Sequence, residues 1–279
     1  MASRTSFSVA GTLRYAAIIL YVLFALFPIY WLVKIAITPD RLIYTEGTHI
    51  WPSTFTLDNF TSVLFLTDFL VYFKNSMIVS LGTAFFTTLV ATAAGYAFSR
   101  FHFRGKAIII ALMLITQMFP LLMIIAPIYK IMAGLRLLDS LTGLIIVYTA
   151  FNVPFATFLM QGFFDGIPKD LEEAAMIDGC TRFEALRKVI FPLTLPGLAA
   201  TLGFIFTAAW SELLFALMLI NSDDKMTFPV GLKTFVSKFA VDWGQMMAAG
   251  TLALIPSCIF FILIQRFLVQ GLTAGAVKG

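Results

Sequence analysis

Long runs without a charged residue constrain this sequence more than any other feature. Each of six such runs can supply the about 20 apolar residues with which a helix crosses the about 30 Å hydrocarbon core of a bilayer. The first run exceeds the apolar stretch of a secretory signal peptide and no small-residue cleavage site follows it, so we interpret it as a span. The expected transmembrane helices cover residues 15–37, 75–99, 107–131, 140–164, 193–220 and 243–268.

The composition agrees with a membrane location. A hydrophobic content of 60%, a charged content of 12% and a mean hydropathy of +0.93 lie far from the averages of soluble proteins. No internal repeat or low-complexity segment is evident. We therefore expect an all-α polytopic membrane protein, with a single transmembrane domain over residues 1–279 and one cytoplasmic loop of functional interest at residues 165–192.

The positive charge of the chain reflects membrane topology. The net charge of +4 is not gathered into a basic cluster with interleaved aromatic residues, which argues against a nucleic-acid partner. The 19 lysines and arginines fall more densely near the two termini, after the second expected span and within the 165–192 loop. The positive-inside rule then predicts that both termini and this loop are cytoplasmic.

The loop at residues 165–192 predicts a helix, a glycine turn and a second helix. Pro168 suits a first helical turn, and the acidic residues that follow it favour the positive end of the helix dipole. Gly179 is expected to end this helix in a left-handed cap, and Thr181 and Glu184 have the spacing of a capping box that starts the next one.

The first of these helices carries a surface suited to another protein. Leu171, Ala174 and Ala175 predict a low apolar patch, which is flanked by carboxylates. Those carboxylates are Glu172, Glu173 and Asp178. The alternative from the residues alone is an amphipathic loop that packs against its own bundle.

Polar groups inside the expected spans are candidates for a translocation pathway. Glu212 lies in an apolar stretch beside Trp210, where an ionisable group costs at least about 2.5 kcal/mol and must face water or a partner. We expect it either to line a pathway, with the Trp210 ring stacking on a sugar, or to pin two helices together. Gln117 and Asn152 are weaker candidates.

Residues that would carry chemistry are not arranged for it in this sequence. His49, His102, Cys180 and Cys258 lack the spacing of metal ligands or of a disulfide framework. The chain has no G-x-x-x-x-G-K-[ST] loop for nucleotide phosphates. We therefore expect no enzymatic activity, no metal and no cofactor in this chain itself.

Several motifs together resemble the permeases of ATP-binding-cassette importers. Glu173-Ala174-Ala175, Gly179 and the segment through Pro192 are similar to the EAA loop of that family, with Val189 and Phe191 in place of its usual isoleucine and leucine. Other segments resemble the carbohydrate-uptake branch of this family, and within it the six-helix subunit of maltose-type transporters. Those segments are Asn75-Ser76, Ala94-Gly95-Tyr96-Ala97-Phe98-Ser99-Arg100-Phe101, Met118-Phe119-Pro120, Trp210-Ser211-Glu212 and Gly271–Gly279. Ser211 departs from the asparagine usual in that branch.

The resemblance implies a set of partners and a role for the loop. It implies a transport subunit that works with a second homologous permease, with two cytoplasmic ATPase subunits that bind ATP and Mg, and with an extracytoplasmic sugar-binding protein, in the inner membrane of a prokaryote. It implies ATPase docking through Glu173, Ala174, Ala175, Asp178 and Gly179. The alternatives are an importer of a non-sugar solute and a secondary transporter, while a membrane enzyme or a structural scaffold is less well supported by the residues.

Overall fold

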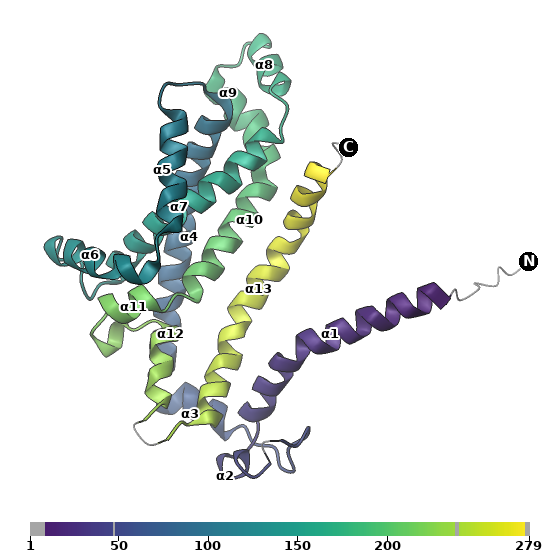
Figure 1. Ribbon diagram of the computed structural model, residues 1–279, viewed down its shortest axis with the longest axis vertical. Coiled ribbons are helices and arrows are strands. Elements are labelled where there is room, and N and C mark those ends of the chain that lie inside the picture. Colours follow the sequence, from purple (N-terminus) through teal and green to yellow (C-terminus); the bar gives the residue numbers. More distant parts are fainter. Residues whose placement is uncertain (1–8, 47, 238–239, 277–279) are drawn as a thin grey trace, which may run out of the picture. The chain divides into compact units, whose positions relative to one another are not determined.

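A computed structural model describes residues 9–46, 48–237 and 240–276, and these are almost entirely helical (Figure 1). The only pairing of strand type in these ranges is a bridge between Val236 and Val241. The chain forms two compact units, which we describe separately. The first contains the residues up to Phe69 together with Leu232–Leu254, and the second contains Leu70–Gly231 and the residues from Ile255 onward. The assignment of the whole chain to one transmembrane domain stays a prediction.

The first unit is built around a long apolar helix. Its elements are α1 (Val9–Ala36), α2 (Asp40–Ile43), α3 (Asp58–Leu66), the 3-10 turn η3 (Leu232–Phe235) and the start of α13 (Trp243–Ala276). Asn59 of α3 donates to the carbonyl oxygens of Ala36 and Thr38, each at 3.0 Å, and so ties α3 to the end of α1. Gly244 lies against Asp40 and Asn59, where a Cβ atom would meet side-chain oxygen and nitrogen atoms at 2.2–2.7 Å.

The second unit holds most of the remaining helices. They are α4 (Phe69–Arg100), α5 (Lys106–Met118), α6 (Leu121–Gly134), α7 (Leu141–Asp165), α8 (Asp170–Ile177), α9 (Arg182–Ala185), the π-helical turn η1 (Leu186–Ile190), α10 (Phe191–Trp210), α11 (Leu214–Leu219), η2 (Asp223–Lys225) and α12 (Phe228–Gly231). In Figure 1, α8 lies at one end of this unit, and α11 and α12 lie toward the other.

Glycines allow close packing inside the second unit. A Cβ atom on Gly95 of α4 would lie 2.8 Å from the backbone nitrogen of Gln161 on α7. On α10, Cβ atoms at Gly197 and Gly203 would collide with Phe163 and Ile264. Small residues of this kind let membrane helices approach closely, so α4 and α10 are held against their neighbours by shape.

The number of membrane helices agrees with the expectation of six if one bent pair counts as a span. Five helices of the described residues are long and apolar enough, and α5 and α6 together form a sixth candidate that bends by 105°. The five are Leu13–Ala36, Phe69–Arg100, Leu141–Asp165, Arg182–Trp210 and Trp243–Gln265.

Two expected spans differ from the structure in their course. The helix expected at 107–131 breaks at Phe119, whose backbone is extended because the following Pro120 disfavours the helical conformation before it. The helix expected at 193–220 instead runs from Arg182 to Trp210 and is followed by the separate helix α11. The upstream extension arises because the second helix of the polar loop continues into the span through η1.

Candidate coupling site

The polar loop between α7 and α10 has the predicted helix, turn and helix. α8 is followed by Gly179, whose φ of 91° is the left-handed conformation expected of a glycine cap. The amide of Cys180 donates to the carbonyl oxygen of Ala175 at 3.0 Å and closes the turn. Thr181 and Glu184 form the predicted capping box at the start of α9.

One face of α8 is exposed and carries three apolar side chains. Leu171, Ala174 and Ile177 are exposed, and Ile177 reaches 85% exposure. Glu173 and Asp178 are exposed beside them. We call Leu171, Glu173, Ala174, Ile177 and Asp178 the outer face of α8. An exposed apolar row rimmed by carboxylates has the character of a docking surface.

The opposite face of α8 corrects part of the sequence interpretation. Glu172 and Ala175, expected within the exposed patch, are buried at 4% and 8% exposure. Residues of a helix turn by about 100° per position, so Glu172 and Ala175 share a face that excludes Ala174. Ile177, which the sequence analysis did not include, takes the place of Ala175 on the outer face.

The buried carboxylate of Glu172 is held by three side chains, two of them from the end of α4. Tyr96 donates its hydroxyl to Oε1 at 2.6 Å, and Arg100 donates Nε–H to Oε2 at 3.2 Å. Arg182 lies 3.9 Å from Oε1 and also stands over the ring of Phe101. We call Glu172, Tyr96, Arg100 and Arg182 the Glu172 network.

The Glu172 network extends to the end of α7. Arg100 also donates to the carbonyl oxygen of Ile167 at 2.9 Å and to the hydroxyl of Ser99 at 3.1 Å. The hydroxyl of Ser99 in turn donates to Asp165 at 2.6 Å. The ends of α4, α7 and α8 are therefore joined by side-chain hydrogen bonds around one buried ion pair.

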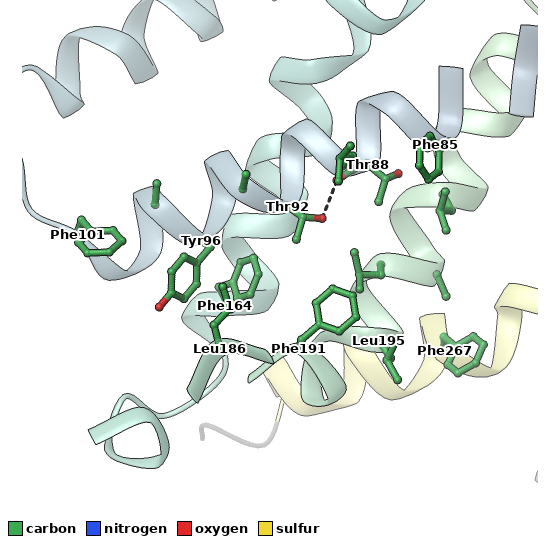
Figure 2. A pocket seen from close by; sticks show the side chains of 16 residues that line it. Phe85, Thr88, Thr92, Tyr96, Phe101, Phe164, Leu186, Phe191, Leu195 and Phe267 are labelled. Atoms are coloured by element: carbon green, nitrogen blue, oxygen red, sulfur yellow. Dashed lines mark hydrogen bonds between the residues drawn. The ribbon is translucent and has the colours of Figure 1, made fainter. Parts of the chain in front are cut away.

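A large apolar cavity adjoins the Glu172 network. It has a volume of about 820 Å³ and is lined mainly by α4 and α10, with Phe267 of α13 on its border. Figure 2 shows Tyr96, Phe101 and Phe164 together at one end of the cavity and Phe85 with Thr88 at the other. The ring of Tyr96 thus lines an apolar space, while its hydroxyl bonds to Glu172.

Glu212 has partners that the sequence did not identify. Its carboxylate accepts the hydroxyl of Tyr148 from α7 and the backbone N–H groups of Phe215 and Ala216, at 2.9 and 3.3 Å for the two amides. It therefore caps the start of α11 and ties this helix to α7.

The other pathway candidates are not gathered around Glu212. Trp210 is 5% exposed and packs edge-on to Phe73 and nearly parallel to Phe206 and Phe228. Asn152 donates to the carbonyl oxygen of Tyr148 within its own helix.

Gln117 lies beside a groove of about 320 Å³ between α5 and α7, and it donates to the carbonyl oxygen of Phe151 at 3.3 Å. The pathway role of these residues stays a prediction. The part of the chain that the structure describes brings no three histidine, cysteine or acidic side chains together as a metal site.

Sequence analysis missed the Glu172 network, although one signal for it was present. Tyr96 and Arg100 are four residues apart at the end of a long helix, so they share a face. The pairing of that face with α8, more than seventy positions later, has no local sequence signature.

A bundle of long apolar helices that presents a short helix on its polar loop defines a polytopic membrane permease. The family model described as "Binding-protein-dependent transport system inner membrane component" matches residues 88–274, and the chain belongs to this family. It is therefore a permease subunit and not an enzyme, and its family works with a further permease, ATPase subunits and a binding protein in the inner membrane.

Similar proteins cover nearly the whole chain. The diacetylchitobiose uptake system permease of Streptomyces coelicolor is 38% identical, over 91% of this chain and 92% of its own. The trehalose transport system permease of Mycobacterium tuberculosis is 37% identical, over 92% and 93%. The trehalose/maltose permease of Thermococcus litoralis is 34% identical, over 94% of each.

A solved structure shows the same fold. It is the crystal structure of a bacterial ABC transporter involved in the import of the acidic polysaccharide alginate. One of its chains matches with a TM-score of 0.79 and 23% identity, over 94% of this chain and 99% of that chain.

Proposed function

We propose that this chain is a permease subunit of a carbohydrate importer and that α8 is the element on which a partner ATPase docks. The observation that carries the docking proposal is the outer face of α8. It combines an exposed apolar row with the carboxylates of Glu173 and Asp178, and its backbone is fixed by the Gly179 turn. Docking therefore requires little ordering of the loop, which lowers the entropic cost of association.

The carbohydrate substrate is supported by what the similar permeases carry. Those described above are named for diacetylchitobiose, trehalose and maltose, and the structural neighbour imports a polysaccharide. A secondary transporter would couple transport to ionisable groups or ion sites within the membrane. Glu212 is a weak candidate for that role, because its carboxylate already accepts three hydrogen bonds.

The partners follow from the same proposal. A second homologous permease would complete the pore, two ATPase subunits would bind ATP and Mg on the cytoplasmic side, and a binding protein outside would deliver the sugar. This arrangement requires α8 and both termini to be cytoplasmic, in agreement with the distribution of lysine and arginine.

The docking proposal is tested by reversing one charge on the outer face of α8. In the assembled transporter in proteoliposomes, Glu173→Lys should reduce sugar uptake about tenfold, and Glu173→Ala should reduce it less, because only the lysine variant places a positive charge at the positive end of the helix dipole and reverses a charge on the docking surface. Asp223→Lys, an exposed carboxylate at the opposite end of the unit, is the matched control.

Two results would contradict the proposal. Equal uptake by Glu173→Lys and the control would remove α8 from the ATPase interface. Uptake that follows an ion gradient and does not need ATP would instead indicate a secondary transporter.

A further inference from the structure

The buried side of α8 is bound to a helix that is distant in the chain. α8 is joined covalently to α7 before it and to α9 after it, and either connection can carry its movement. The contacts of Glu172 with Tyr96 and Arg100 add a third connection, across 76 and 72 positions of sequence, to α4.

The charges of this third connection suit the helix ends that carry them. Arg100 is the last residue of α4, where a cation favours the negative end of the helix dipole. Glu172 lies in the first turn of α8, where an anion favours the positive end. The two side chains are only 4% and 6% exposed, so water does not weaken their attraction.

Burial makes this ion pair sensitive to separation. Removal of one member of a buried pair leaves an uncompensated charge and is strongly unfavourable, whereas replacement of both members is often tolerated. A displacement of α8 away from α4 has a similar effect, because it separates Glu172 from Arg100 and leaves the half-exposed Arg182, 3.9 Å away, as its remaining cationic neighbour. The lower free energy is reached when α4 follows α8.

One side of α4 is not closely packed, although its other side lies against α7 at Gly95. α4 has 32 residues and is about 48 Å long at about 1.5 Å per residue. The apolar cavity of about 820 Å³ lies beside its second half, between α4 and α10, and begins at Tyr96 (Figure 2). Close packing therefore does not hold this side of α4 against α10.

We propose that Arg100 and Glu172, supported by Tyr96, are positioning residues that transmit the movement of α8 to α4 during transport. This proposal rests on the docking of an ATPase on α8. It adds α4 to the helices that respond to that ATPase, and it makes the buried ion pair the connection on which the coupling of ATP hydrolysis to sugar uptake depends.

A double-mutant cycle in the assembled transporter tests the proposal. Arg100→Gln and Glu172→Gln should each lower the sugar taken up per ATP hydrolysed about tenfold, because each leaves one buried charge without its nearest partner. The double variant carries neither charge. Its sugar uptake per ATP should therefore be higher than that of either single variant and lie within about threefold of the wild-type value. Tyr96→Phe, which keeps the ring and removes one hydrogen bond, should have a smaller effect. Arg104→Gln, an exposed arginine of the same α4–α5 connection, is the matched control.

A second measurement separates this proposal from the docking proposal. A cysteine at Ala174, in a background without Cys180 and Cys258, should crosslink to the ATPase equally well in the wild type and in the Arg100 and Glu172 variants. No crosslink in the otherwise unchanged chain would overturn docking on α8. Normal crosslinking together with an unchanged sugar uptake per ATP in both single variants would overturn the role of the ion pair and leave docking on α8 in place. Additive losses in the double variant would also overturn it.

Discussion

The two ends of α7 are fastened in different ways. The N-terminal end of α7 is held through Asp139, two residues before the helix begins. The Asp139 carboxylate accepts hydrogen bonds from the backbone N–H groups of Asn221 and Ser222, from the Ser222 hydroxyl and from Lys225 Nζ, all within 3.0 Å. Its side chain is 25% exposed and that of Lys225 is 41% exposed. At the other end, the Arg100 and Glu172 side chains of the Glu172 network are only 4% and 6% exposed, although Arg182 is 52% exposed.

This difference predicts how well each end of α7 should tolerate substitutions. Asp139 is held by several neutral donors as well as one cation, and water can replace a lost partner. Glu172 is compensated mainly by Arg100, and the burial of both side chains limits the access of water that could replace a lost partner. We therefore expect the α8 end to be intolerant of small changes and the Asp139 end to be tolerant, and the following predictions test this contrast.

The largest effect should come from two glycines of α4 that face opposite ends of α7. Gly95→Ala would place a Cβ atom 2.8 Å from the backbone of Gln161, whereas Gly82→Ala would meet the flexible end of Ile145 at 2.9 Å. Both changes gain the same helix propensity, so their difference reports packing. Gly95→Ala should destabilise by about 1–3 kcal/mol relative to Gly82→Ala, measured as thermal unfolding in detergent. Equal midpoints would contradict the contrast.

The second prediction tests whether the sensitivity of a site to substitution is set by its burial or by the end of α7 at which it lies. Glu212 bonds Tyr148, which is close to the Asp139 end but is 2% exposed. Glu212→Leu leaves the Tyr148 hydroxyl and two amides without an acceptor and should cost about 1–3 kcal/mol. Glu212→Gln keeps one acceptor oxygen and should cost less in the same unfolding assay. Full stability of the leucine variant would show that the carboxylate does not anchor α11.

The third prediction concerns the pH dependence of the exposed cluster. Hydrogen bonds from Ser222, reinforced by Lys225, hold the pKa of Asp139 well below its ordinary value of 3.8. A lowered pKa in the folded state stabilises the fold above the ordinary pKa, and this contribution is lost as the pH falls through the folded value. Asp139→Asn should therefore lower the unfolding midpoint at neutral pH, by less than about 1 kcal/mol, and the difference from wild type should shrink below about pH 4. A difference that stays constant into acid would contradict this.

The smallest effect should be at the turn after α8. An alanine at Gly179 would meet no atom within 4 Å, so its cost is only the strain of a φ of 91°, about 1 kcal/mol. Gly162→Ala, which is equally open but lies within α7, should instead stabilise by up to about 1 kcal/mol. Shifts of opposite sign in the thermal unfolding midpoints of the two variants would show that the cost at Gly179 is backbone strain and not packing. A higher midpoint for Gly179→Ala would be inconsistent with the left-handed turn.

Local features of the fold were predicted well from the sequence because their causes are local. The Gly179 cap and the Thr181–Glu184 capping box depend on residues within four positions, and both are confirmed. The all-α membrane fold followed from the length of the apolar runs and is confirmed by the structural neighbour.

Features that depend on distant residues were not predicted. The span at 107–131 was expected without a break, because the sequence does not say whether neighbouring helices support the backbone groups that Pro120 frees. The contact of Glu172 with Arg100 and the contact of Glu212 with Tyr148 are both tertiary, and each joins residues more than sixty positions apart. The exposed side of a short helix cannot be chosen until such partners are known.

The π-helical turn η1 sets the rotation of α10 about its own axis. A π turn holds one residue more than an α turn, and one residue corresponds to about 100° of rotation. The capping box at Thr181 fixes where the helix starts, while Gly197 and Gly203 must face Phe163 and Ile264. The extra residue in Leu186–Ile190 brings these two requirements into phase within one continuous helix. Deleting a residue there would leave the helix intact and turn its glycines away from the side chains they accommodate.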